Sequence, residues 1–296
     1  MTVAIVLKIA DGLVLGADSA STLGNETGVV NVYFNAEKVI NLYKGLPIGT
    51  VTYGLGNIDR RSTTNLAKEL RERFMGSDPK WAINRASYTI EQIADQVKAF
   101  FYDEFYTKEY PQQVTDAQGT VQDVYAQMGF MVAGYSAGQR QPEGYTVEID
   151  NKGVCIVTPV LDSSAYGAVV RGDSEAVLRL LNGWSPRVYQ GMVAAGIPEK
   201  DVSQFLNGLQ MEPLVQAYMP IQDGIDLVRY LIQVTEGFVR FRPREPTVHE
   251  PIDLAAITYH EGFRWVQRKH YYSSELNATF PVNVVAAPTP NSSGGS

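Results

Sequence analysis

The sequence predicts an α+β fold in which two antiparallel sheets are covered by helices on both outer faces, a four-layer αββα sandwich. Blocks of short β-branched runs alternate with blocks of helical periodicity, and tight turn signals separate the runs within each block. A parallel sheet would instead need single strands alternating with single helices. We find no internal repeat and no linker, so we expect one domain over residues 2–272 and a C-terminal extension over 273–296, flexible at its Pro-, Ser- and Gly-rich end.

Strands are predicted throughout the first block. The runs at 2–9 and 12–19 are separated by Ala10 and Asp11 and followed by Gly12, which favours a hairpin. Further strands are expected at 29–35, 36–43 and 47–54. Residues 60–75 and 88–106 then carry apolar side chains at helical spacing, while the polar segment 107–127 is predicted to be a loop or an elaborated helix end.

The second half of the chain repeats this order. Strands are predicted at 129–136, 144–150 and 153–159, then helices, and finally two strands that close the chain at 252–260 and 263–271. The helices are expected at 172–184 and 223–241. Blocks of strands alternating with blocks of helices support the sandwich.

Composition excludes several classes of function. The chain has 296 residues with a formal net charge of −7, so a nucleic acid backbone would be repelled overall. No stretch approaches the roughly 18 to 20 apolar residues of a membrane helix, and the N-terminus lacks the pattern of a secretory signal. The single cysteine, Cys155, fits a reducing compartment. We therefore expect a cytoplasmic protein that binds neither nucleic acid nor membrane.

Familiar cofactor and metal motifs are missing from the sequence. The "GLGNID" stretch at 54–59 lacks the third glycine of a dinucleotide-binding loop. The three histidines, His249, His260 and His270, are eleven and ten residues apart, which suits no metal site. No GxSxG elbow is present. We expect neither a cofactor nor a metal.

Thr2, Asp18 and Lys38 form the candidate site. If the first hairpin turns at residues 10–12, Asp18 pairs back near residue 3 or 4 and lies beside Thr2, and a lysine on a neighbouring strand can reach both. Removal of Met1 would give Thr2 a free amine beside its hydroxyl, which is one way to activate a hydroxyl nucleophile without histidine. By composition alone, however, Thr2 is a chance second residue, Asp18 a turn residue and Lys38 a solvated strand residue.

Three motifs in order resemble those of proteasome β subunits. "TVAIVLKIADGLVLGADSAST" is similar to the start of those subunits, "NAEKVINL" to their lysine-bearing strand, and "VTYGLGN" to the strand whose glycine N–H faces the reacting carbonyl. The resemblance covers residues 2 to about 60, and "VHEPIDLAAITYHEGFRW" is similar to the closing strand pair. It implies the N-terminal-nucleophile hydrolase fold.

The resemblance also implies roles for individual residues. Thr2 would be nucleophile and base, Lys38 the activator, Asp18 its partner, and the Gly54 N–H an oxyanion donor. A further set is implied to line the primary specificity pocket or to support the amine: Ser21, Ile40 and Thr52 for the pocket, and Ser163 or Ser164 for the amine. The late-helix aspartate of the family has no counterpart in "VTEGF".

The function implied is a bacterial-type, proteasome-like threonine peptidase. It would be a self-compartmentalised homo-oligomeric ring acting on peptides or unfolded proteins, with an ATPase unfoldase as a candidate partner. Extra residues around 103–126 and after 270 suggest ring contacts of its own. Two alternatives stay open: an N-terminal-nucleophile amidase acting on a small amide, and a catalytically silent ring subunit.

Overall fold

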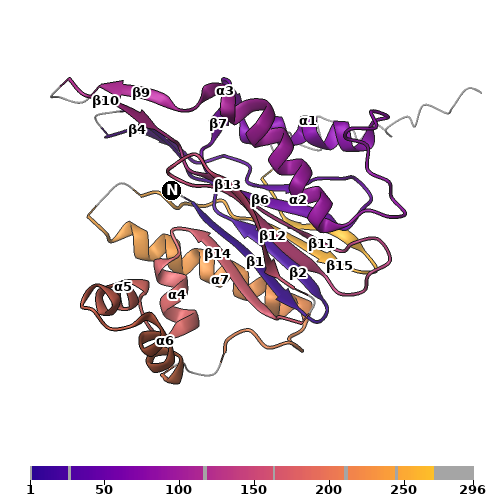
Figure 1. The fold of residues 1–296 in the computed structure, drawn as a ribbon. Coiled ribbons are helices and arrows are strands. Elements are labelled where there is room, and N and C mark those ends of the chain that lie inside the picture. The colour runs from indigo at the N-terminus through magenta and orange to yellow at the C-terminus, as the bar shows by residue number, and fades with distance from the viewer. Residues whose placement is uncertain are drawn as a thin grey trace, which may run out of the picture.

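The structure is a computed structural model. It describes residues 2–25, 28–115, 119–162, 164–209, 213–243 and 246–269. The extension predicted over 273–296 lies outside this range, and the single domain expected over 2–272 stays a prediction. Figure 1 shows two sheets at the centre of the molecule with helices around them.

The first sheet contains the N-terminal hairpin. Its strands, in spatial order, are β14 (Gly167–Gly172), β1 (Val3–Ile9), β2 (Gly12–Ala17), β15 (Asp253–Thr258) and β16 (Gly262–Gln267), and all neighbours are antiparallel. Ile9 pairs with Gly12 and Ala4 with Ala17, which confirms the predicted hairpin and its turn. Strand β14 was not predicted, because its short run lies between glycines and resembles the approach to a helix.

The second sheet is also antiparallel throughout. Its spatial order is β13 (Cys155–Leu161), β12 (Glu143–Ile149), β11 (Met128–Gly134), β6 (Ile48–Gly54) and β5 (Val39–Asn41). Three two-stranded ribbons accompany the two sheets. They are β3 (Ser21–Asn25) with β4 (Gly28–Tyr33), β7 (Asn57–Ile58) with β8 (Arg61–Ser62), and β9 (Gln112–Thr115) with β10 (Val121–Val124).

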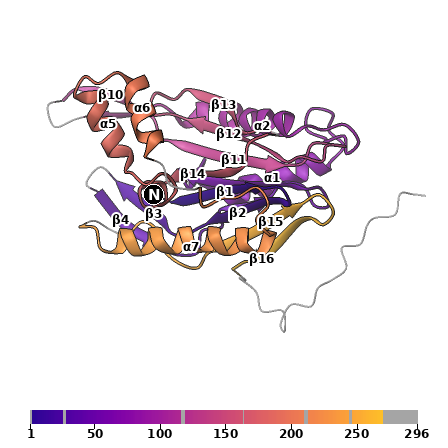
Figure 2. The same cartoon turned by 90° about the horizontal axis from the view of Figure 1, so that it is seen from below.

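The helices divide between the two sheets. α2 (Ile90–Lys98) contacts β11, β12 and β13, and α1 (Thr63–Met75) contacts β5. On the other side, α7 (Ile221–Arg240) contacts β1, β2 and β15 and runs along the first sheet, as Figure 2 shows. The remaining helices are the π-helix η1 (Ala99–Tyr106), α3 (Thr107–Glu109), α4 (Glu175–Asn182), α5 (Pro186–Ala194) and α6 (Glu199–Gly208).

Two sequence expectations need correction here. The segment 107–127, predicted to be a loop or an elaborated helix end, begins with α3, which directly follows η1, and then forms the hairpin of β9 and β10, which was not predicted. The helix predicted over 88–106 is divided into α2 and the π-helical η1. The start of α2 is well defined, since Thr89 and Gln92 form a capping box there.

Strand β1 is apolar except for Lys8, because both of its faces pack against other parts of the protein. Val3, Ile5 and Leu7 belong to the core cluster shared with α7, whereas Ala4 and Val6 belong to the cluster between the two sheets. Every residue of β1 is buried, so both faces of the strand are covered. Burying one such side chain contributes about 1.5 to 3 kcal/mol, so β1 holds Thr2 at the end of a rigid strand.

Substitution of Gly16 by alanine tests how closely α7 packs on the first sheet. A Cβ at Gly16 would lie 2.4 Å from Val228 Cγ1 and 2.9 Å from Leu254 Cδ2, so we expect Gly16→Ala to destabilise the protein by about 1 to 3 kcal/mol. On the same helix, a Cβ at Gly237 would meet no atom within 4 Å, so Gly237→Ala should instead stabilise by about 0.5 to 1 kcal/mol. Chemical denaturation measures both; equal effects of the two variants would contradict the close packing.

Candidate active site

Thr2 lies at the start of β1 and is 5% exposed. Its carbonyl oxygen accepts a hydrogen bond of 2.6 Å from the backbone N–H of Asp173, which follows β14. Next to Asp173, Gly172 has a φ of +81°, and a Cβ there would lie 1.8 Å from the Thr2 carbonyl oxygen. The turn after β14 therefore fixes the backbone of Thr2, and only glycine fits at position 172.

Asp18 follows β2 at the position that the hairpin register sets. Its carboxylate is fully buried and accepts the backbone N–H groups of Val3 at 3.0 Å and Ala20 at 2.9 Å, with His249 N–H at 3.4 Å. A buried carboxylate needs such donors, because its desolvation is otherwise costly. Asp18 is thus bonded to Val3, the residue that directly follows Thr2.

Lys38 completes a buried ion pair with Asp18. Its ammonium donates to Asp18 Oδ1 at 2.8 Å and to the carbonyl oxygen of Ala20 at 2.5 Å, and its side chain is 7% exposed. Burial lowers the pKa of Lys38 from its usual value, while the Asp18 carboxylate opposes this by stabilising the charged form. The Asp18 carboxylate thus fixes the position of the positively charged Lys38 ammonium.

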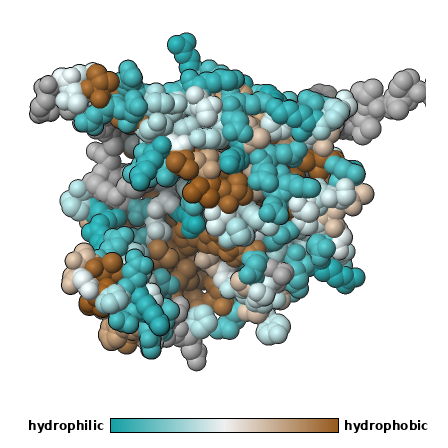
Figure 3. All heavy atoms as spheres, in the orientation of Figure 1, coloured by the Kyte–Doolittle hydropathy of each residue, from teal (hydrophilic) through white to brown (hydrophobic). Residues whose placement is uncertain are grey.

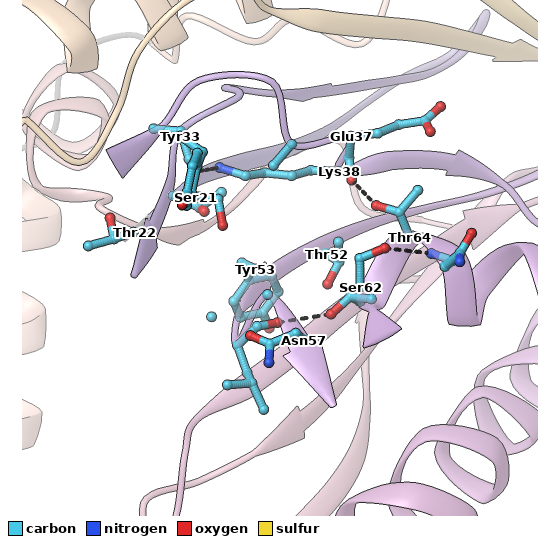
Figure 4. A pocket seen from close by; sticks show the side chains of 18 of the residues that line it. Ser21, Thr22, Tyr33, Glu37, Lys38, Thr52, Tyr53, Asn57, Ser62 and Thr64 are labelled. Carbon is cyan, nitrogen blue, oxygen red and sulfur yellow. Dashed lines mark hydrogen bonds between the residues drawn. The ribbon is translucent and has the colours of Figure 1, made fainter. Parts of the chain in front are cut away.

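Thr2, Lys38 and Gly54 line one cavity of about 790 Å³. Figure 4 shows Lys38 extending toward the strand of Ser21, while the carboxylate of Glu37 points away from that strand. The wall is rich in hydroxyl and amide side chains, contributed by Ser21, Thr22, Asn35, Thr52, Asn57, Ser62, Thr63, Thr64, Asn65 and Gln127. Such a wall offers hydrogen-bond donors and acceptors to a polar ligand.

Gly54 ends strand β6 and lines the same cavity. Its φ is +83°, and a Cβ would lie 2.4 Å from the carbonyl oxygen of Gln127, so the local backbone requires glycine. Two residues earlier, the Thr52 N–H donates to the Lys38 carbonyl oxygen at 2.9 Å. Strand β6 thus carries Gly54 at a fixed distance from the lysine.

The predicted pocket residues are only partly brought together. Ser21 and Thr52 line the cavity with Thr2. Ile40 does not, because its side chain is 2% exposed and packs in the cluster between the second sheet and its helices. The specificity role predicted for Ile40 is therefore not supported, and its contribution is to the core.

Ser164 is not placed near Thr2. Its hydroxyl donates to Asp162 Oδ1 at 2.8 Å in the loop after β13, and the carbonyl oxygen of Asp162 accepts from Lys8 at the far end of β1. Thr2 and Lys8 are six residues apart on an extended strand, which corresponds to about 20 Å. The structure thus contradicts a contact between Ser164 and the Thr2 amine; Ser163, the alternative, lies outside the described residues.

Asp173 is the neighbour of Thr2 that the sequence interpretation missed. Besides its backbone contact with Thr2, its carboxylate is buried and lies 3.5 Å from Arg242 Nη1. The signal in the sequence was "GDS", a glycine and an acid directly before a helix. It could be interpreted only with β14 in place, since β14 brings this turn to the end of β1.

In the part of the chain that the structure describes, no three His, Cys, Asp or Glu side chains are grouped closely enough to hold a metal ion. Within the same residues, every helix is too short or too polar to span a bilayer.

Among known proteins, the chain is similar to solved structures. No protein-family model matches the chain, and no curated protein matches it. Among solved structures, an Anbu mutant from Hyphomicrobium sp. strain MC1 is similar, with a TM-score of 0.49, 15% sequence identity, and coverage of 91% of this chain and 86% of that one. At this level the likeness by itself assigns neither a family nor an activity to this chain.

Replacing Gly172 tests the contact that fixes Thr2. Gly172→Ala must relieve both a left-handed backbone and a clash with Thr2, whereas Gly183 has a similar φ of +78° but nothing within 4 Å. We expect Gly183→Ala to lose about 1 to 2 kcal/mol from the backbone alone and Gly172→Ala to lose more. Denaturation midpoints measure the difference, and equal losses would show that the Thr2 contact is not tight.

Proposed function

We propose that this chain is a proteasome-like threonine peptidase in which Thr2, after removal of Met1, is the nucleophile. The observation that carries the proposal is that Thr2, Gly54 and Lys38 line one cavity, with the Lys38 ammonium paired to the buried Asp18 behind it. These groups come from separate segments of the chain. A hydroxyl, a lysine ammonium and a glycine backbone at one cavity are the groups that acyl transfer needs.

We also propose that the fold is the αββα sandwich of N-terminal-nucleophile hydrolases. Support comes from the two five-stranded antiparallel sheets, from the apolar cluster between them, and from α2 and α7, which contact different sheets. In such a fold the first strand begins at the site, so the N-terminal residue is presented by a strand buried on both faces.

In the proposed reaction, the Thr2 hydroxyl oxygen attacks the substrate carbonyl carbon and its proton passes to the α-amine of Thr2. The usual pKa of an α-amine, about 7.7 to 8.0, suits this proton transfer near neutrality. Lys38 stabilises the developing alkoxide, and the Gly54 N–H donates to the oxyanion. The C–N bond then breaks, and the amine product leaves with the proton.

The second half of the reaction releases the acyl group. Water attacks the resulting ester, gives its proton to the same α-amine, and the ester C–O bond breaks to restore the Thr2 hydroxyl. We propose Asp173, in place of Ser164, as the residue that supports the amine, since its backbone N–H donates to the Thr2 carbonyl oxygen and its side chain is buried. An acid there would keep the amine oriented. No step requires a cofactor.

A peptide epoxyketone tests the assignment of Thr2, because this electrophile needs a hydroxyl and an amine on one residue to form its ring. We expect one label for each chain that begins at Thr2 and none on a chain that retains Met1 or on Thr2→Ala. Thr2→Ser should keep part of the reactivity, since both groups survive. Intact-mass spectrometry measures the label, and full labelling of the Met1-bearing chain would refute the proposal.

Lys38→Ala, with Lys44→Ala as its matched control, tests the role of Lys38 in the same assay. Lys38→Ala should react at least tenfold more slowly, because the loss of one electrostatic stabiliser costs about 3 to 4 kcal/mol in comparable sites. Lys44→Ala removes an exposed lysine six residues further on and should react like the parent protein. A peptide substrate and a small amide compared in parallel would separate a peptidase from an amidase.

We further propose that copies of the chain associate, because a ring peptidase that acts on unfolded proteins requires several subunits. An ATPase unfoldase is a candidate partner of such a ring. Helices α5 and α6 expose apolar side chains, with Val188 47% and Phe205 55% exposed, and Figure 3 shows this apolar surface at the lower left. Light scattering should give a mass well above 32.7 kDa at micromolar concentration. A monomer would contradict the ring and favour the amidase.

A further inference from the structure

A second buried ion pair lies behind the first. Asp253 begins β15 and Lys269 follows β16, and their side chains, 0% and 6% exposed, are in direct contact. The backbone N–H of Lys269 also donates to Asp253 Oδ1 at 3.1 Å. The proposed reaction does not use either residue.

The Lys269 ammonium joins the two segments that carry Asp18 and Lys38. Besides Asp253, it donates to Ser19 Oγ at 2.5 Å and to the Ala36 carbonyl oxygen at 2.9 Å. Ser19 directly follows Asp18, and Ala36 lies two residues before Lys38. All three N–H donors of this ammonium are therefore directed at partners around the catalytic pair.

The separation of these two segments decides whether Lys38 reaches Asp18. The backbone supplies one direct link, the hydrogen bond of 3.0 Å from Ala36 N–H to the Ser19 carbonyl oxygen. Lys269 adds a side-chain link on the same two residues, anchored to β15 through Asp253. Removing it would let the segments move apart, and the geometry of a buried ion pair tolerates little movement.

The second pair also acts through charge. Lys38 titrates among several charges: burial lowers its pKa most, Asp18 raises it, Lys269 lowers it and Asp253 raises it. Other groups face this region from neighbouring elements, namely Glu37 with its partners Lys68 and Arg268, the half-buried Arg71, and His249. Without Lys269, the uncompensated Asp253 carboxylate would favour protonated Lys38.

We propose that Lys269, held by Asp253, is a positioning residue that sets the geometry and charge of the Lys38–Asp18 pair. The inference rests on the proposed function. A purely structural role would be limited to anchoring the end of β16 to β15. The two roles differ in their effect on reactivity and on the titration of Lys38.

The test compares Lys269→Met with the double variant Asp253→Asn, Lys269→Met, which removes both charges and keeps an acceptor for the backbone N–H of residue 269. Arg264→Met is the control, since it removes a cation from an exposed position on β16. For each folded variant, the rate of epoxyketone labelling is measured against pH. The Lys38 pKa is measured separately by NMR with isotope-labelled lysine.

We expect both Lys269 variants to label at least tenfold more slowly than the parent, and Arg264→Met to match it. The Lys38 pKa should rise in Lys269→Met, and the high-pH midpoint at which labelling is lost should rise with it, because labelling uses protonated Lys38. Both values should return toward those of the parent in the double variant, whose labelling rate stays low. A parent-like rate in either folded Lys269 variant, or an unchanged Lys38 pKa in Lys269→Met, would overturn the inference. If the parent protein does not label, the proposed function fails, and the NMR titration alone decides the role of Lys269.

Discussion

The buried ion pair between Lys38 and Asp18 is the constraint on which the rest of the site depends. Two charges with almost no exposure are stable only when their remaining hydrogen-bonding capacity is satisfied. Asp18 meets this requirement with backbone N–H groups, and Lys38 donates a second N–H to the Ala20 carbonyl oxygen. The first sheet, the loop after β2 and the segment before β5 must therefore be correctly placed together.

The same requirement explains why the site lies at one end of the molecule. Strand β1 presents Thr2, the antiparallel register returns β2 to the same end with Asp18, and β6 in the other sheet brings Gly54 there. The turn after β14 closes the arrangement with Gly172 and Asp173 against the Thr2 backbone. The cavity thus forms where both sheets end.

Local sequence patterns predicted the first hairpin well, because a two-residue turn fixes register, and register fixes which residues face each other. Asp18 was expected near residue 3 or 4, and it bonds to Val3. Ser164 was misplaced for the opposite reason. With β14 unrecognised, nothing in the sequence indicated that the loop at Asp162 lies at the Lys8 end of β1 rather than at the Thr2 end.

Other features depend on contacts between distant segments. Ile40 was expected in the pocket, yet its side chain joins the core beneath the helices, which only the packing of β5 decides. Lys269 lies 231 residues beyond Lys38, and no local periodicity relates the two. Sequence reasoning therefore identified the residues of the hairpin and missed the turn and the second ion pair that support them.

The central claim is that Thr2 becomes the first residue and acts through its own amine. An intact mass of the purified protein, read beside its rate of peptide hydrolysis, tests this most directly. We expect active preparations to lack the mass of one methionine residue, and the rate to scale with the fraction of chains that begin at Thr2. Full hydrolytic activity in a preparation that retains Met1 throughout would contradict the account.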